Sequence, residues 1–278
     1  MGTDGAVVKS SMTAKSESVG TQPVWHLQML GQFRAIRPDS PASEGVIIDR
    51  FQTQKTSLLL AILTHSSRPV SREDLVERLW PDAEPAAGRD RLSQALSWLR
   101  RRFESDAALP AGGVFGADRQ SVWLLPGAFS TDVAAFDAGV RATRAPSGDT
   151  EQVASVIEAA LALYAGPLLP GICEEDAVLF REQQRLAGAY EDALRRVVVL
   201  HENAGRFPNA VAHARRLLGL NPADEETCAR LLRLFARTGE REAALRTVSS
   251  FTRRYRDAHG GNSPSNMLQQ LAQAVRAR

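Results

Sequence analysis

The chain has 278 residues, of which 44% are hydrophobic and 24% are charged, and its formal net charge at pH 7 is +2. This composition is typical of a globular protein long enough for two domains. It excludes a membrane-spanning protein, because no apolar run approaches the roughly 18 residues that a membrane helix needs. The start of the chain lacks the basic, apolar and small-residue regions of a signal peptide, so we expect residues 1–23 to be a disordered leader.

The two cysteines, Cys173 and Cys228, are far apart and lie in apolar helical patterns. We therefore expect two buried, reduced thiols rather than a disulfide or a metal-binding pair. Reduced thiols and the missing signal peptide together predict a cytoplasmic protein.

Three short β-favouring runs, residues 24–30, 32–36 and 46–48, predict a small antiparallel sheet at the front of the first domain. They are separated by Gly31 and by the turn-rich segment RPDSPASEG. An apolar helix follows, in RFQTQKTSLLLAILTHSS. Ser71 then begins a second helix as its N-cap, with Asp74 at the capping-box position.

The helix predicted over residues 85–103 has two different faces. At 100° per residue, a narrow apolar stripe forms from Leu92, Ala95, Leu96, Leu99 and Phe103. The opposite face carries Asp90, Gln94, Ser97 and Arg101, and four more arginines flank the stripe: Arg89, Arg91, Arg100 and Arg102. These amide, hydroxyl and guanidinium groups suit base edges and phosphates. The alternative is that the arginine-rich face is simply solvated.

Positive charge is concentrated in this part of the chain. Residues 50–103 contain ten Lys or Arg and six Asp or Glu. Next, VFGADRQSVWLLP predicts a hairpin of two strands around Ala117, Asp118 and Arg119. A sheet, three helices and a hairpin, in that order, predict a winged helix-turn-helix over residues 24–126.

Several segments in this order carry a family resemblance: LGQFRA, PVSREDLVERLWPD, RDRLSQALSWLRRRF and DRQSVWLLPG. They resemble the response-regulator-type winged helix at the front of SARP-like regulators, which are transcriptional activators that carry a bacterial transcriptional activator domain. The resemblance implies that the third helix lies in the major groove of promoter DNA and that the hairpin contacts the backbone or minor groove. The DNA-binding residues expected on this basis are Arg89, Arg91, Gln94, Ser97, Trp98, Arg100, Arg101 and Arg119. For Trp98, packing is the alternative.

Residues 130–278 change to a helical pattern. Asp132 is expected to cap a helical hairpin, and a long amphipathic helix follows in DAVLFREQQRLAGAYEDALRRVVVLHENAG. Gly205 and Gly239 are then 34 residues apart, as are Ala210 and Ala244, which is the tetratricopeptide period. A last helix is expected to begin with Ser263 as its cap and Pro264 at its first position. The segments AGPLLPG and SPSNMLQQL resemble the bacterial transcriptional activator domain.

The sequence contains no recognisable catalytic set. It has no phosphate-binding G-x-x-x-x-G-K-S/T loop, and its histidines are dispersed: His26, His65, His201, His213 and His259. His201 is interpreted as a core histidine, and the acidic run from Glu174 to Asp176 as charge that complements a helix dipole. We therefore expect no enzymatic activity, no cofactor and no metal.

The predicted fold is mainly α with small β-sheets: an N-terminal winged helix and a C-terminal tetratricopeptide-like domain. The predicted function is sequence-specific binding of promoter DNA through residues 86–103, with transcription activated through the helical domain. RNA polymerase, or a second protomer in a homodimer on DNA, is the partner that the resemblance implies. The alternative is a protein-interaction adaptor whose winged helix does not bind DNA.

Overall fold

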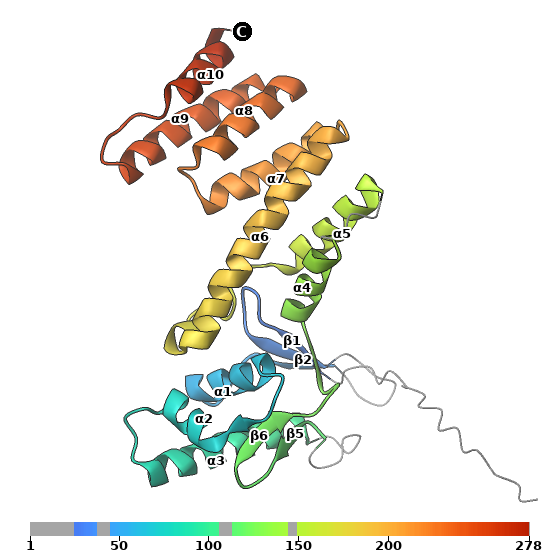
Figure 1. Ribbon diagram of the computed structural model, residues 1–278, viewed down its shortest axis with the longest axis vertical. Helices are drawn as coiled ribbons and strands as arrows, with labels where there is room; N and C mark the ends of the chain where they lie inside the picture. Colours follow the sequence, from blue (N-terminus) through green and yellow to red (C-terminus); the bar gives the residue numbers. More distant parts are fainter. Residues whose placement is uncertain (1–24, 38–44, 106–112, 144–148, 278) are drawn as a thin grey trace, which may run out of the picture.

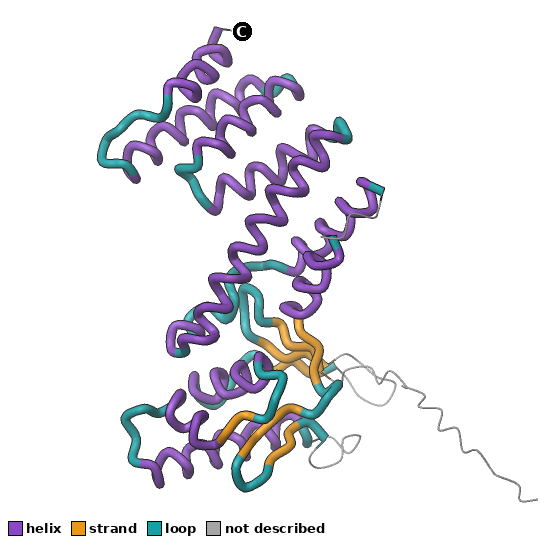
Figure 2. Tube along the Cα trace, in the orientation of Figure 1, coloured by secondary structure: helices purple, strands orange, loops and turns teal. Residues whose placement is uncertain are grey.

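The computed structural model describes residues 25–37, 45–105, 113–143 and 149–277 (Figure 1). The expected leader at residues 1–23 lies outside these ranges. The molecule is elongated, with both sheets at one end and an array of helices extending to the other (Figure 2). No helix within the described ranges is long and apolar enough to cross a membrane.

The first sheet combines strands from two distant parts of the chain. Its order is β3-β2-β1-β7, with antiparallel pairing among the first three strands. The last strand pairs parallel to β1, with Trp25 opposite Phe129. The bounds are β1 Trp25–Gln28, β2 Arg34–Arg37, β3 Val46–Ile48 and β7 Phe129–Thr131. The antiparallel part was predicted, whereas the addition of β7 was not.

The winged helix is completed by three helices and a second sheet of order β4-β6-β5. Thr53 caps α1 and Ser71 caps α2, where the Ser71 hydroxyl accepts from the N–H groups of Glu73 and Asp74. This confirms the predicted cap of the second helix. The bounds are α1 Gln54–His65, β4 Val70–Ser71, α2 Arg72–Leu79, α3 Pro85–Phe103, β5 Phe115–Ala117 and β6 Ser121–Leu124.

The α3 helix packs closely against α2 through a glycine. A Cβ atom at Gly88 would lie 2.3 Å from Val76 Cγ1, so a larger residue would require the Val76 side chain or the helices to shift. The predicted apolar stripe is buried, from Leu92 to Phe103. The opposite face of α3 is consequently turned away from the core.

The remaining chain is helical and forms antiparallel pairs. The bounds are α4 Asp132–Ala142, α5 Thr150–Leu163, a 3-10 turn at Cys173–Glu175, α6 Ala177–Asn203, α7 Phe207–Leu220, α8 Glu225–Thr238, α9 Arg241–Ala258 and α10 Asn266–Ala277. The predicted 34-residue repeat corresponds to the pairs α6–α7 and α8–α9. Gly205 and Gly239 have φ values of 71° and 75°, which a glycine adopts without strain at the turn between paired helices. Ala210 and Ala244 are buried where each second helix meets its partner.

Two predicted helix starts differ from the structure. Thr131, not Asp132, is the N-cap of α4, and its hydroxyl accepts from the Ala134 N–H. The last helix begins at Asn266 rather than at Pro264, and Pro264 is buried in the preceding loop. There the Pro264 carbonyl accepts a side-chain hydrogen bond from Gln269, so the proline fastens the loop to α10 instead of starting the helix.

The apolar interior consists of two clusters. The first is continuous from Trp25 in β1 to Leu217 in α7, so it joins the winged helix to α4, α5 and α6. The second lies between the C-terminal part of α6, where it includes Val198, and α7, α8, α9 and α10. The winged helix therefore shares its core with the first half of the helical region.

Candidate nucleic-acid interface

The outer face of α3 carries a group of exposed polar and basic side chains. Its exposed members include Arg89, Arg91, Gln94, Ser97, Arg101 and Arg102. None of these arginines forms an ion pair with another residue that the structure describes. The α3 helix is at the opposite end of the molecule from α10 (Figure 1).

Two residues predicted to bind DNA lie on the flanks of α3 and are half-buried. The Arg100 guanidinium donates a hydrogen bond of 3.4 Å to the Phe115 carbonyl in β5. Trp98 lies beside Phe51 at a ring distance of 6.1 Å, and Phe51 in turn stacks on Phe33 at 4.8 Å. Both side chains therefore pack against the scaffold as well as bordering the exposed face.

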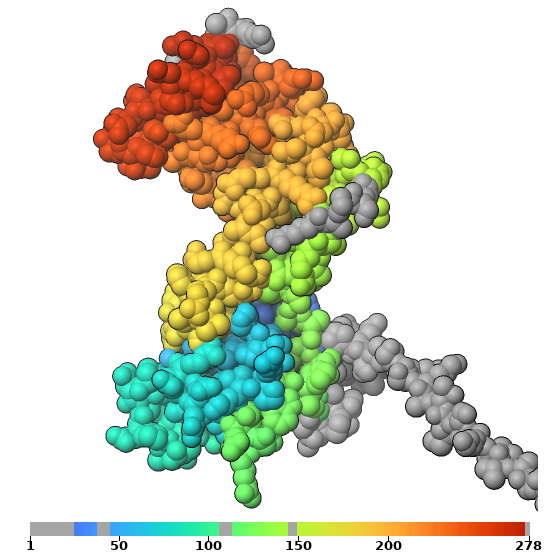
Figure 3. All heavy atoms as spheres, viewed as in Figure 1, coloured from blue at the N-terminus to red at the C-terminus, as the bar shows by residue number. Residues whose placement is uncertain are grey.

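The turn between β5 and β6 is held by its own hydrogen bonds. Asp118 Oδ1 accepts from the N–H groups of Ser121 at 2.6 Å and Gln120 at 2.7 Å, and these bonds lower the pKa of Asp118 below its ordinary value. Arg72 Nε donates to the Asp118 carbonyl at 3.1 Å. Arg119 is exposed at this turn. The β5–β6 hairpin and α3 lie in the same lower part of the molecule (Figure 1), which Figure 3 shows with all heavy atoms.

The C-terminal end of α3 is fixed to the wing and to the first sheet. Glu104 Oε1 accepts from the N–H groups of Val114 and Phe115, at 3.0 and 2.9 Å. Trp25 Nε1 donates to the Phe103 carbonyl at 3.3 Å, and the two rings meet edge to face at 4.9 Å. These contacts fix the orientation of the exposed face of α3.

Sequence reasoning missed the residues that connect this surface to the helical region. Asp132 is 3% exposed, and its two carboxylate oxygens accept from the N–H groups of Met29 and Leu30 at 2.9 Å. Burial raises the pKa of Asp132, although the backbone N–H donors act in the opposite direction. From the sequence, the position of Asp132 at the start of a helix had indicated only that it caps the helix.

The acidic run before α6 also has a second role. Lys55 in α1 pairs with Glu175 at 2.6 Å, and Arg78 in α2 pairs with Asp176 at 2.8 Å. The run was interpreted from sequence as complementing the helix dipole. Asp176 does cap α6, and it also connects α6 to the winged helix.

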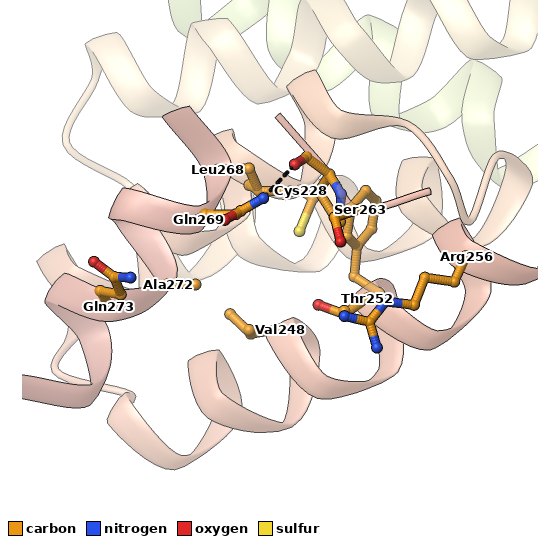
Figure 4. Close-up of a pocket in the computed structure, with 11 residues that line it drawn as sticks. Cys228, Val248, Thr252, Arg256, Ser263, Leu268, Gln269, Ala272 and Gln273 are labelled. Atoms are coloured by element: carbon orange, nitrogen blue, oxygen red, sulfur yellow. Dashed lines mark hydrogen bonds between the residues drawn. The ribbon is translucent and has the colours of Figure 1, made fainter. Parts of the chain in front are cut away.

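Neither thiol is poised for nucleophilic chemistry. Burial raises the pKa of both Cys173 and Cys228 to about 12, which disfavours the reactive thiolate. Cys228 lines a pocket of about 210 Å³ bordered by α9 and α10, together with Val248 and Leu268 (Figure 4). Both cysteines are free, as predicted.

Comparison with known proteins assigns the helical region. A family model described as the bacterial transcriptional activator domain matches residues 131–276. The chain belongs to this family. It is a SARP-like transcriptional regulator, which confirms the resemblance noted in the sequence. No curated protein matches the chain in sequence.

A solved structure supports the fold assignment of this SARP-like regulator. The fold is similar to that of Mycobacterium tuberculosis EmbR in complex with a low affinity phosphopeptide, with a TM-score of 0.64 and 21% sequence identity. The similarity covers 92% of this chain and 66% of the EmbR chain, so the chain spans about two thirds of EmbR. The predicted combination of a winged helix with an all-α repeat domain is thereby confirmed.

Proposed function

We propose that this regulator binds double-stranded promoter DNA, with α3 in the major groove and the β5–β6 turn against the phosphate backbone. The proposal rests on which arginines form ion pairs and which do not. Those on the outer face of α3 have no acidic partner among the described residues, whereas several on the helical array form ion pairs: Arg185, Arg195, Arg206, Arg215, Arg230 and Arg246. Guanidinium groups without carboxylate partners are available to phosphates and to guanine edges.

The two sides of α3 support this orientation. Leu96 and Leu99 are buried in the core, so Gln94 and Arg101 on the opposite side face away from the protein. A helix fixed at its C-terminal end by Glu104 and Trp25 can enter a groove without first having to be ordered. The β5–β6 turn, made rigid by Asp118, brings Arg119 to the same end.

A protein partner for the helical region is the second part of the proposal. Val199 in α6 is 37% exposed and Leu220 at the end of α7 is 50% exposed. A groove lies between α6, α7 and α8, lined by apolar residues such as Val198 and Leu217 and by five charged residues: Asp192, Arg195, Arg196, Glu226 and Arg230. Repeat arrays of this type bind partners along extended surfaces. RNA polymerase, or a second copy of the regulator on adjacent DNA, is the partner we propose.

The DNA-binding proposal is tested with the full chain and a random duplex library. Repeated enrichment is expected to yield a preferred site, and fluorescence anisotropy then gives its affinity at several salt concentrations. For about six phosphate contacts, affinity is expected to fall by roughly 10³-fold between 50 and 200 mM salt. An adaptor with an inactive winged helix would enrich no sequence and would bind no duplex even at low salt.

The partner proposal is tested on the enriched site. Analytical ultracentrifugation of the full chain with duplexes carrying one or two sites distinguishes independent from cooperative binding. Transcription in vitro with purified RNA polymerase measures activation, and Leu220→Glu is expected to reduce it while DNA affinity is unchanged. Full activation by Leu220→Glu would exclude this part of the surface from the contact.

A further inference from the structure

Three side chains from three different helices converge where α5 meets the first repeat pair. Glu158 Oε1 in α5 lies 2.9 Å from His201 Nε2 in α6 and 3.2 Å from His213 Nε2 in α7. The three atoms all lie within 4.8 Å of one another. Since the histidines are 43 and 55 residues from the glutamate in sequence, no metal-binding motif was recognisable there.

The cluster is protected on one side and open on the other. The His201 side chain is 1% exposed and the His213 side chain 12%, whereas Glu158 is 38% exposed. The two imidazole rings are parallel, with an interplanar angle of 5° and centroids 5.6 Å apart. Two stacked cationic rings in a buried site would repel each other, so this arrangement favours neutral imidazoles.

The surroundings of His213 and Glu158 shift the pKa values of these two groups. Burial lowers the pKa of His213 below its ordinary value, although its hydrogen bond to Glu158 acts in the opposite direction. Partial burial alone would raise the pKa of Glu158, but the hydrogen bonds to His201 and His213 outweigh it and hold this pKa below its ordinary value. Neutral imidazole and ionised carboxylate are the forms that bind metal ions.

We propose that Glu158, His201 and His213 bind one divalent transition-metal ion of the zinc class, with water in the remaining position. Imidazole nitrogen combined with carboxylate oxygen suits Zn²⁺, whereas Mg²⁺ and Ca²⁺ prefer oxygen ligands alone. At bond lengths of 2.0–2.1 Å, neighbouring ligand atoms around a tetrahedral ion are about 3.3 Å apart. The two separations from Glu158, 2.9 and 3.2 Å, are close to this value, and the two Nε2 atoms lie within 4.8 Å of each other, so side-chain rotations would bring the three ligand atoms around one ion.

The surroundings of Nδ1 in each imidazole ring leave Nε2 available as a metal ligand. His201 Nδ1 and His213 Nδ1 are buried and have no hydrogen-bond partner among the residues that the structure describes. Because no donor among those residues forms a hydrogen bond to Nδ1, this nitrogen can accept the ring proton. Each neutral ring can therefore move its proton from Nε2 to Nδ1, and the Nε2 lone pair then binds the ion in place of the hydrogen bond to Glu158.

A metal ion at this position would fasten the α4–α5 hairpin to the first repeat pair. In the structure described here these elements are also linked by Arg206, which pairs with Glu151 at 3.0 Å near the start of α5. The ion adds a second connection farther along the same helix. Because Glu158 forms the open side of the cluster, the remaining coordination position faces solvent, and the ion can exchange with metal in solution.

The test measures metal binding by the full chain. Protein stripped with a chelator is titrated with Zn²⁺ against a chromogenic competitor, and the metal retained after desalting is counted by mass spectrometry. One Zn²⁺ per chain is expected. His213→Asn and Glu158→Gln are expected to weaken binding at least about 10-fold, since each removes a direct ligand. His65→Asn is the matched control, because His65 is exposed at the end of α1, and it should bind Zn²⁺ like the wild type.

Co²⁺ gives an independent readout of geometry. The wild-type chain is expected to show the intense visible absorption of tetrahedral Co²⁺, and both ligand variants are expected to lose it. Circular dichroism of the metal-free variants checks that they fold. If His213→Asn does not fold, the test relies on Glu158→Gln, because Glu158 is half-exposed. Absence of stoichiometric Zn²⁺ in the wild type, or wild-type affinity in a folded Glu158→Gln variant, would overturn the proposal.

Discussion

Arg78 Nε in α2 donates a hydrogen bond of 2.8 Å to Asp176 Oδ2 at the start of α6. The other oxygen of Asp176 caps α6 by accepting from the N–H groups of Val178 and Leu179, at 3.0 and 2.9 Å. The aspartate side chain is only 3% exposed. A single carboxylate therefore fixes both the first turn of the longest helix and its contact with the winged helix.

The Asp176 contact predicts a pH dependence of stability. Burial opposes ionisation, but Arg78 and the α6 N–H groups outweigh it and hold the pKa of Asp176 below its ordinary value of 3.8. Because the pKa is lower in the folded chain than in the unfolded chain, the carboxylate stabilises the fold above about pH 4. That stabilisation is lost as the pH falls through the folded-state pKa.

The measurement compares the wild type with Asp176→Asn by urea unfolding. At pH 7 the variant is expected to lose about 1–3 kcal/mol of unfolding free energy, since a charge-assisted hydrogen bond is removed. The difference should shrink as the pH is lowered below about 4. Asp192→Asn, at an exposed position in the same helix, serves as the control. A difference that is independent of pH would contradict this account of Asp176.

Asp132→Asn should destabilise the junction between β1 and α4. Asp132 Oδ2 accepts from the N–H groups of Met29 and Leu30, and Oδ1 accepts from those of Met29 and Val133, so either orientation of an asparagine amide leaves at least one of these donors facing an NH₂ group. Such an unpaired donor costs about 1–3 kcal/mol of unfolding free energy. Urea unfolding at pH 7 measures the loss, and unchanged stability would show that the junction can rearrange.

Local patterns in the sequence predicted much of this fold. The helix at 85–103, the Ser71 cap, the β5–β6 hairpin and the 34-residue repeat were all recognisable, because each depends on neighbouring residues or on a short period. By contrast, β7 joins β1 across about a hundred residues, and a three-residue strand has no periodicity to reveal its partner. Local pattern alone cannot anticipate such a pairing.

In the candidate site, too, the sequence predicted positions that depend on one helix but not contacts between separate helices. The outward position of Gln94 and Arg101 followed from the helical period, since it depends on α3 alone. The pairing of Arg78 with Asp176 and the meeting of Glu158 with His201 depend on how separate helices stack. Sequence spacing carries no signal for contacts of this kind, and an acidic residue at a helix start is already explained by the helix dipole.

Arg101→Ala tests the proposed groove-facing side of α3. If the guanidinium contacts a base, affinity for the preferred duplex should fall by about 1–3 kcal/mol and discrimination at one base position should relax. Gln94→Ala should affect a neighbouring position. Arg253→Ala, at an exposed arginine of α9, makes the same change of charge far from α3 and should leave binding unchanged. Intact specificity in both α3 variants would show that another face contacts the bases.

Arg119→Ala tests the wing separately from the helix. A phosphate contact carries no sequence information, so the variant should bind all duplexes more weakly by a similar factor. The slope of log affinity against log salt should become shallower by about one unit. Anisotropy titrations of preferred and random duplexes over a salt series measure both quantities. A change in sequence preference would mean instead that Arg119 reads a base or the shape of the minor groove.

The two apolar clusters predict where the chain can be cut. A chain ending at Pro126 lacks β7 and Asp132, which leaves the N–H groups of Met29 and Leu30 without their acceptor and exposes the edge of β1. It also loses Phe129, whose ring lies 5.5 Å from that of Phe103. We expect this fragment to lack a cooperative unfolding transition.

A fragment ending at residue 221 keeps the whole first cluster and loses α8, α9 and α10, which belong to the second. It should unfold cooperatively and bind the preferred duplex as tightly as the full chain, because the removed helices lie far from α3 (Figure 1). Cooperative unfolding and specific DNA binding by the shorter fragment would show that the winged helix is independent of the shared core.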